Sequence, residues 1–198
     1  VERYNIKNTG VIKWLINYLL SSVSKEISLN KIFLNLKSKG IKLSKNTLYE
    51  YFNMLEDSFF LFSIKKQNYS AKREDLSTPK IYIGDVAYMN LFSLEDFGRR
   101  LENIVFLELV RKRNLDITSD ISYWKSKDNS EVDFVISKGR KVNQLIQVCY
   151  NLNDENKKRE FNGLIEAMKA FKLKEGLLLT YDTEEEVKAE GKKIIIKP

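Results

Sequence analysis

The spacing of apolar residues changes along this chain, and that change limits the folds open to it. In the first part apolar residues recur every three or four positions, which is the period of a helix with one buried face. In Glu131-Val-Asp-Phe-Val-Ile136 they recur at every second position, which is the period of a strand. The sequence therefore predicts an α+β or α/β protein in which a helical part precedes a part built on a sheet.

The first part is predicted to hold three helices. The first covers residues 9–24, Ser28 can cap a second, and Ser44 can cap a third. Apolar runs at 59–62 and 79–84, separated by a polar segment, then predict two strands joined by a polar tip. Three helices followed by a two-stranded wing indicate a winged helix-turn-helix domain over residues 1–93.

A winged helix can place its third helix in a DNA groove while its wing contacts phosphates. The candidate base-contacting residues on that helix are Lys45, Asn46, Tyr49 and Asn53. The candidate phosphate contacts on the wing are Lys65, Lys66, Lys72 and Arg73. Residues 1–93 hold 14 Lys and Arg against 8 Asp and Glu, a net charge of +6, whereas residues 94–198 hold 20 against 19, a net charge of +1. This imbalance favours a DNA or RNA partner for the first domain.

Other interpretations of the basic half stay open. Glu50, Glu56 and Asp57 lie on or near the third helix and would repel phosphate. Winged helices also serve as spacers and protein-docking modules, and surface lysines keep many proteins soluble.

The second part, residues 94–198, is predicted to be a domain with a mixed central sheet. It opens with a helix over 99–113 that carries Glu102, and strands follow at 121–126, 131–136 and 145–150. Alternation within the last two strands places Asp133 near Gln147 and Cys149. A crossover helix over 156–171 and further strands over 175–180 and 193–197 complete the predicted elements.

This order resembles the core of the PD-(D/E)xK nuclease superfamily, which has a restriction-endonuclease-like fold. More closely, the chain resembles the C-terminal region of the archaeal-type ATPase family, in which an AAA-like ATPase module precedes a winged helix and a nuclease-like domain. The segments that carry the resemblance are Thr47-Leu-Tyr-Glu-Tyr-Phe-Asn-Met-Leu-Glu-Asp57, Pro79-Lys-Ile-Tyr-Ile-Gly-Asp85, Gly98-Arg-Arg-Leu-Glu-Asn-Ile-Val105, Tyr123-Trp-Lys125, Glu131-Val-Asp-Phe-Val135 and Ile146-Gln-Val-Cys149.

The resemblance implies a role for each acidic or amide residue of the pattern. Asp133 would be the principal ligand of Mg²⁺ or Mn²⁺, Gln147 the second ligand, and Glu102 the helix carboxylate that supports the metal. Glu131 would be a spare carboxylate. ATP would bind only in an upstream module, because the chain has no Gly-x-x-x-x-Gly-Lys-Ser/Thr loop.

The chain departs from the nuclease pattern at the position where such enzymes carry a lysine. Cys149 stands there, and a thiol cannot stabilise the charge that develops on a scissile phosphate. Gln147 also offers one negative charge fewer than a glutamate would. We therefore expect a regulatory, nucleic-acid-binding domain that does not hydrolyse nucleic acid by itself. Two alternatives stay open: a metal-dependent nuclease in which Lys125 replaces the missing lysine, and a scaffold that binds only proteins.

Composition excludes several other classes. The chain has no histidine and one cysteine, which removes Ser-His-Asp catalysis, Cys/His zinc sites and an internal disulfide framework. Its apolar runs are far shorter than the ~20 residues of a membrane span. These features favour the cytoplasm and no membrane partner, and they are compatible with an oligomer. Because the chain starts with Val1 and ends directly after a strand-like segment, we expect a fragment trimmed at both ends.

Overall fold

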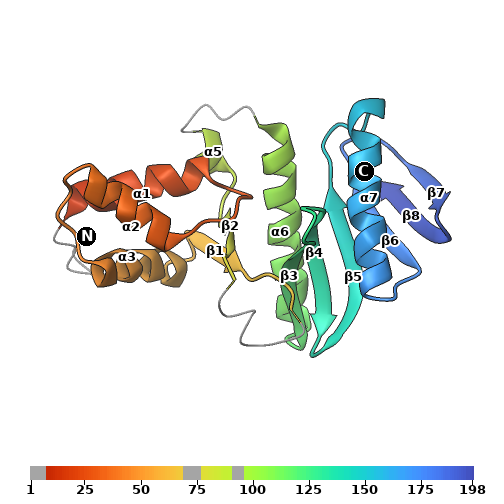
Figure 1. The fold of residues 1–198 in the computed structure, drawn as a ribbon, viewed down its shortest axis with the longest axis horizontal. Helices are drawn as coiled ribbons and strands as arrows, with labels where there is room; N and C mark the ends of the chain where they lie inside the picture. The colour runs from red at the N-terminus through yellow and green to blue at the C-terminus, as the bar shows by residue number, and fades with distance from the viewer. Residues whose placement is uncertain (1–7, 69–76, 91–95) are drawn as a thin grey trace. The chain divides into compact units, whose positions relative to one another are not determined.

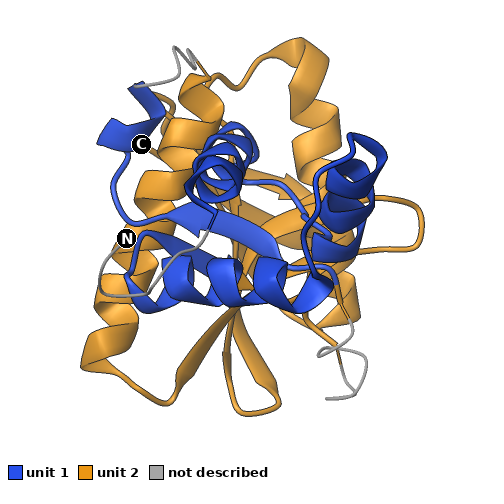
Figure 2. Cartoon of the chain, turned by 90° about the vertical axis from the view of Figure 1, so that its left-hand side faces the viewer, with its two compact units in different colours: residues 1–63, 78–95 blue, residues 64–77, 96–198 orange. Residues whose placement is uncertain are grey.

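The structure is a computed structural model that describes residues 8–68, 77–90 and 96–198. The chain divides into two compact units, shown in different colours in Figure 2. The first comprises residues 1–63 and 78–95, and the second comprises residues 64–77 and 96–198. The segment that leads from β1 toward the predicted wing tip therefore belongs with the second unit.

The first unit is mainly helical. Its elements are α1 (Thr9–Ser21), α2 (Leu29–Ser38), α3 (Lys45–Asp57), β1 (Leu61–Ile64), β2 (Lys80–Ile83) and α5 (Ala87–Asn90), where β1 pairs with β2 and its last residue is counted with the second unit. The buried faces of the three long helices meet in one apolar core, whose fully buried members include Leu15, Leu19, Leu36 and Leu48.

Capping side chains fix where these helices begin. The hydroxyl of Ser28 accepts the N–H of Lys31 at the start of α2, and that of Ser44 accepts the N–H of Thr47 at the start of α3. Both predicted caps are confirmed. The first helix is shorter than predicted, because it ends at Ser21 and Ser24 has a φ of +63°, which does not continue a helix.

The second unit is a sheet with a helix on each face (Figure 1). Its elements are α6 (Phe97–Leu115), β3 (Ser119–Lys125), β4 (Glu131–Lys138), β5 (Lys141–Val148), α7 (Asp154–Ala170), β6 (Glu175–Leu179), β7 (Glu185–Ala189) and β8 (Lys192–Lys197). The strand order is β3-β4-β5-β6-β8-β7, with parallel pairing of β5 to β6 and of β6 to β8 and antiparallel pairing elsewhere. The predicted mixed sheet is thus present in a mixed α+β chain.

A β-bulge interrupts β4 at the residues of greatest interest. Trp124 pairs with Val132 and Ser122 pairs with Val135, so that two residues of β4 stand opposite Tyr123 alone. As a result Val132 and Val135 both belong to the core cluster that α7 covers. The strict alternation predicted from the sequence placed them on opposite faces, and that prediction was wrong because of the extra residue.

Helix α7 lies very close to the sheet. A side chain on Gly163 would place its Cβ 2.6 Å from the main-chain oxygen of Glu131, and one on Gly176 would place its Cβ 2.9 Å from Leu164. Both glycines therefore allow α7 and the strands to approach more closely than larger residues would permit. On the opposite face, Phe106 of α6 packs on Phe134 with ring centroids 6.4 Å apart.

The segment after β1 is attached to β3. Lys66 forms a parallel bridge with Tyr123, the N–H of Gln67 donates to the carbonyl of Tyr123 at 2.7 Å, and the N–H of Tyr123 donates to the carbonyl of Lys65 at 3.1 Å. Residues 65–67 were predicted to begin the polar tip of the wing. In the structure they are held by main-chain hydrogen bonds within the second unit.

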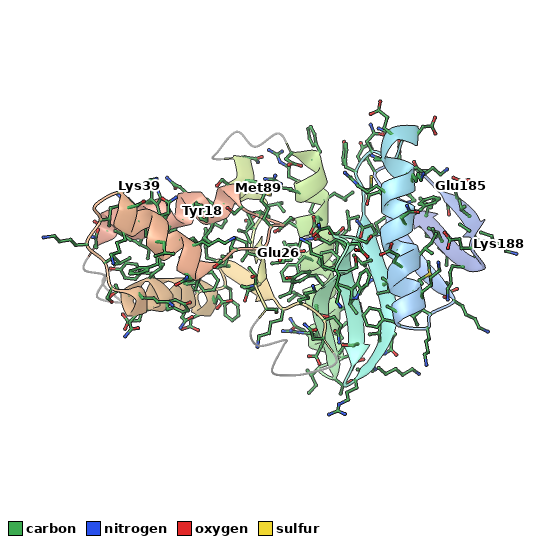
Figure 3. All side chains as sticks on the ribbon, in the orientation of Figure 1. Tyr18, Glu26, Lys39, Met89, Glu185 and Lys188 are labelled. Atoms are coloured by element: carbon green, nitrogen blue, oxygen red, sulfur yellow. The ribbon has the colours of Figure 1, made fainter. Side chains whose placement is uncertain are left out.

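The outer strand β7 is rich in charged residues. Figure 3 labels two of its exposed side chains, Glu185 and Lys188. Glu185 pairs with Lys157 of α7 at 3.4 Å, and Lys193 of β8 pairs with Glu186 at 2.9 Å.

In the part of the chain that the structure describes, no helix combines the length and the apolar content that crossing a bilayer requires.

Candidate functional site

The candidate site lies where β4 and β5 separate. Their antiparallel ladder ends at the pair Phe134–Ile146, and β5 continues beside β6, where Val148 pairs with Leu179. The two strands therefore form a fork with Asp133 on one arm and the segment from Gln147 on the other. Polar side chains at such a fork are held by main-chain groups that the sheet leaves unpaired.

A cleft of about 660 Å³ opens at this fork, and helix α7 forms one of its walls. The described residues that line it are all polar or charged: Asp128, Asn129, Ser130, Glu131, Asp133, Gln147, Glu155, Lys158, Arg159, Glu160 and Asn162. Five of these eleven residues are acidic and two are basic, so the cleft carries a net negative formal charge. Such a surface attracts cations and repels free phosphates.

Three buried side chains link the arms of the fork to α7. The main-chain N–H of Asp133 donates to Oε1 of Gln147 at 3.2 Å, and Nε2 of Gln147 donates to Oε2 of Glu160 at 2.8 Å. In return, Oδ2 of Asp133 accepts the N–H of Val148 at 3.0 Å. An N–H can only donate and a carboxylate can only accept, so these partners fix the orientation of the Gln147 amide.

Arg159 extends this network toward solvent. Its Nη2 and Nε lie 2.6 and 3.1 Å from Oε1 of Glu160, whose side chain is 6% exposed whereas that of Arg159 is 79% exposed. The carboxylate of Glu160 is therefore shared between a buried amide and an exposed guanidinium. The hydrogen bond from Arg159 to Glu160 raises the pKa of the guanidinium, so Arg159 stays charged.

Cys149 lies on the same strand arm but points into the core under α7. Its thiol is 3.5 Å from the carbonyl of Asn151. Burial, followed by the nearby carboxylates of Glu160 and Asp133, raises the pKa of Cys149 to about 11. At neutral pH this group is a neutral thiol, which can neither stabilise a phosphate charge nor activate water as a lysine could.

The substitute lysine considered from sequence is already engaged with a carboxylate. Lys125 stands opposite Glu131 in the β3–β4 ladder, and its Nζ lies 3.9 Å from Oε2 of Glu131. Both side chains are about 30% exposed, at 28% and 32%. Lys125 lines a different cavity from the one that holds Asp133 and Gln147.

Glu102 is buried on α6, at 9% exposure, and it is not among the described residues that line the cleft. Across residues 8–68, 77–90 and 96–198, no set of three or more Cys, Asp and Glu residues is arranged to hold a metal ion. Oδ2 of Asp133 and Oε1 of Gln147 each accept a hydrogen bond from a main-chain N–H group. As arranged, a divalent cation would have to compete with these N–H groups for Oδ2 of Asp133 and Oε1 of Gln147.

The first unit presents the residues predicted to contact bases on one helix. Lys45, Asn46, Tyr49 and Asn53 of α3 are all exposed, and Nζ of Lys45 lies 5.7 Å from the ring centroid of Tyr49. Of the predicted wing contacts, Lys65 is exposed and Lys66 is half-buried beside β3. Lys72 and Arg73 lie outside the described residues.

Comparison with known proteins identifies two family models that match this chain. A family model described as a domain of unknown function, DUF4143, matches residues 97–197, which is just over half of the chain. The chain belongs to the DUF4143 family. A second model, also described as a domain of unknown function (DUF8612), matches residues 2–97, in front of the DUF4143 domain.

Two relatives are similar over nearly the whole chain. An uncharacterized protein of Methanocaldococcus jannaschii is 38% identical over 202 residues, which cover 100% of this chain and 44% of that protein. An uncharacterized protein of Haemophilus influenzae is 24% identical over 197 residues, which cover 98% of this chain and 46% of that protein. The chain thus spans less than half the length of these relatives. No solved structure matches it.

Two residues of the DUF4143 domain were missed by sequence reasoning. Glu160 and Arg159 of α7 complete the network around Gln147, yet neither was among the candidate residues predicted from the sequence. A clue was present, because Glu160 lies four residues before Leu164 and therefore on the same buried helix face. A carboxylate on an apolar stripe indicates a buried partner, and here that partner is Gln147.

Proposed function

We propose that this chain is the nucleic-acid-binding and regulatory part of a larger AAA-like ATPase. In this proposal the first unit is a winged helix that binds DNA or RNA through α3. The second unit is a PD-(D/E)xK-like domain that has lost hydrolytic activity and serves as a structural or regulatory platform.

The exposed face of α3 carries the binding proposal. Its buried residues, Leu48, Tyr51, Phe52 and Leu55, anchor the helix, while the rest of its surface presents a lysine, two asparagines and a tyrosine to solvent. Asparagine can pair with the edge of adenine, and lysine can contact guanine or phosphate. Glu50 is exposed on the same helix, and a carboxylate weakens phosphate attraction but can accept from cytosine.

The loss of hydrolysis is supported by the chemistry at the fork. A nuclease of this class needs a divalent metal and a cation near the scissile phosphate. Cys149 contributes a neutral buried thiol, and Gln147 uses its amide to join Asp133 to Glu160. The net negative formal charge of the cleft also disfavours an approaching phosphate that has no metal beside it.

The link to an ATPase rests on the family and on length. DUF4143 domains are often found in AAA-like ATPase proteins. The relatives are more than twice as long as the shared region, which leaves room for a further module. The ATPase itself, its ATP site and its cytoplasmic location are parts of the proposal.

The test is a salt-dependent binding measurement. A mixed-sequence labelled duplex is titrated with the 198-residue chain, and anisotropy is recorded from about 50 to 200 mM salt. We expect measurable binding at the lowest salt, with an affinity that falls steeply as salt rises. If Lys45 contacts a phosphate, Lys45→Ala lowers the slope of log affinity against log salt by about 0.9. Asn46→Ala and Asn53→Ala weaken binding without changing that slope.

A matched control removes the same charge elsewhere in the first unit. Lys13 is exposed on α1 and has no predicted contact with nucleic acid, so Lys13→Ala should leave both affinity and slope unchanged. Equal losses for Lys13→Ala and Lys45→Ala would show that binding is only general charge attraction. No binding at the lowest salt to either duplex DNA or duplex RNA would leave the first unit as a spacer or protein-docking module.

A further inference from the structure

We propose that the second unit holds a separate site for a single unpaired nucleotide, in a cavity beside β3. This cavity has a volume of about 320 Å³ and is distinct from the cleft at the β4–β5 fork. The residues that would do the binding are Lys66, Gln67, Trp124, Lys127 and Phe171. The ligand class is one base with its phosphate, presented by single-stranded nucleic acid.

Two aromatic side chains form an apolar wall of the cavity. Trp124 and Phe171 are half-buried and meet edge to face, with ring centroids 6.2 Å apart and an interplanar angle of 71°. Both pack against the core on one side, which holds the rings in place. Aromatic rings fixed in this way are the usual platforms on which unpaired bases stack, because every base has a π face.

Lysines supply charge complementary to a phosphate. Lys66, Lys125 and Lys127 all line the cavity, and no aspartate or glutamate is among its described lining residues. Lys125 is engaged by Glu131 on the neighbouring strand, so Lys66 and Lys127 are better placed to bind an added anion. Lys127 is exposed in the turn after β3, and Lys66 is half-buried in the bridge to Tyr123.

Gln67 can contribute a directed hydrogen bond. The hydroxyl of Ser122 donates to Oε1 of Gln67 at 2.6 Å, and with the amide in this orientation its Nε2 is a donor. The carbonyl oxygens of thymine, uracil, cytosine and guanine are suitable acceptors. Because the main chain of Gln67 is itself bonded to Tyr123, this donor is positioned before any ligand arrives.

The size of the cavity limits the ligand. Pockets that bind small molecules have volumes of about 300–1,000 Å³, and this one lies at the lower end of that range. It can take one nucleotide but cannot accept a duplex. Hence the site differs from α3 in both residues and ligand, and it does not depend on the function proposed for the first unit.

The test uses Trp124 as a reporter. The chain has two tryptophans, so in a Trp14→Phe variant the indole fluorescence comes from Trp124 alone. Phenylalanine keeps an aromatic ring against Tyr18, which stacks on Trp14 with centroids 5.3 Å apart. Oligothymidylate, oligouridylate, thymidine monophosphate and a duplex of equal length are titrated separately. We expect saturable quenching by a single-stranded oligomer, and the better of the two oligomers shows whether a DNA-type or an RNA-type strand is preferred.

Charge reversals at two exposed lysines decide whether the cavity is responsible. We expect Lys127→Glu to weaken single-strand binding at least tenfold. Lys188→Glu makes the same charge change on β7, at the other end of the sheet from β3, and should have no effect. Absence of quenching, equal losses in both variants, or equal affinity for the duplex would each overturn the proposal. Duplex binding through α3 is scored separately by Lys45→Ala, so the two proposals can fail independently.

Discussion

The main-chain N–H of Asp133 donates to the side chain of Gln147. This side chain replaces the main-chain acceptor that the N–H would have if the β4–β5 ladder continued past Phe134–Ile146. In the opposite direction, the carboxylate of Asp133 accepts a hydrogen bond from the N–H of Val148. Two residues that a nuclease would devote to a metal are used here to close a fork in the sheet.

Removing the Asp133 carboxylate should destabilise the second unit. In Asp133→Ala the N–H of Val148 loses its acceptor in a partly buried setting, which costs about 1 kcal/mol or more. Asp133→Asn keeps an acceptor oxygen and should lose less. The measurement is urea unfolding of each variant in the Trp14→Phe background, followed by the fluorescence of Trp124. An Asp133→Ala variant as stable as its parent would mean that the fork does not depend on this bond.

Adding a third carboxylate at the fork should create a metal site. Gln147→Glu places a new carboxylate beside Asp133 and Glu160, and the repulsion among them is relieved by a divalent cation. We expect saturable Mn²⁺ binding by calorimetry in Gln147→Glu and none in the wild type at millimolar metal. Gln144→Glu, an exposed change on the same strand, is the control and should resemble the wild type. Wild-type binding that disappears in Asp133→Ala would instead revive the metal-dependent nuclease.

The thiol of Cys149 should react slowly until the solution is strongly alkaline. Its pKa is raised from 9.0 to about 11, so the thiolate fraction at pH 8 is about 100-fold smaller than for an unshifted thiol. The rate of alkylation by iodoacetamide, measured by mass spectrometry, should increase as the pH rises toward 11. The urea-unfolded chain is the control and should react at the ordinary rate.

The same shift makes folding stability fall at high pH. Between pH 9 and 11 the unfolded chain has lost the thiol proton while the folded chain still holds it, so the unfolded state is favoured as pH rises. Below pH 9 both states keep the proton and this group contributes no pH dependence. Cys149→Ser should remove this part of the alkaline decline, and an unchanged decline in Cys149→Ser would assign it to other groups.

Gly163→Ala should destabilise the chain although alanine is the better helix former. The new Cβ would lie 2.6 Å from the main-chain oxygen of Glu131, and crowding of this kind typically costs 1–3 kcal/mol. Gly98→Ala at the start of α6 is the control, because the nearest atom to its Cβ would be 3.4 Å away on a side chain. Urea unfolding should separate the two variants. A Gly163→Ala variant at least as stable as Gly98→Ala would show that α7 can move away from β4 at little cost.

The structural features that depend on neighbouring residues in the sequence were predicted well. Ser28 and Ser44 begin their helices because a hydroxyl before an amphipathic run meets an N–H in the first turn, and this depends only on nearby residues. Most of the sheet was predicted in the same way, since alternation is also local. The short outer strand β7, Glu185–Ala189, was not predicted, because its charged residues obscure the alternation.

Features that depend on a distant partner were not predicted. The bulge at Asp133 and Phe134 is defined by the single residue opposite them, Tyr123, which the sequence of β4 does not reveal. Likewise, the pairing of residues 65–67 with β3 joins segments more than fifty positions apart. In the candidate site, the predicted proximity of Asp133 and Gln147 is present, whereas Cys149 points into the core and Glu160 was missed because its partner lies on another element.

The pairing of residues 65–67 with β3 also bears on aggregation. An outer strand with open N–H and C=O groups can recruit a strand from another molecule and extend the sheet indefinitely. Beside Tyr123 those groups are already taken by the chain itself. At the other end of the sheet, β7 relies instead on the charges of Glu185, Glu186 and Lys188. The two edges of the sheet are thus protected from pairing with another molecule in different ways. At β3 the main-chain groups are already hydrogen-bonded, and at β7 charged side chains repel an approaching strand and stay hydrated.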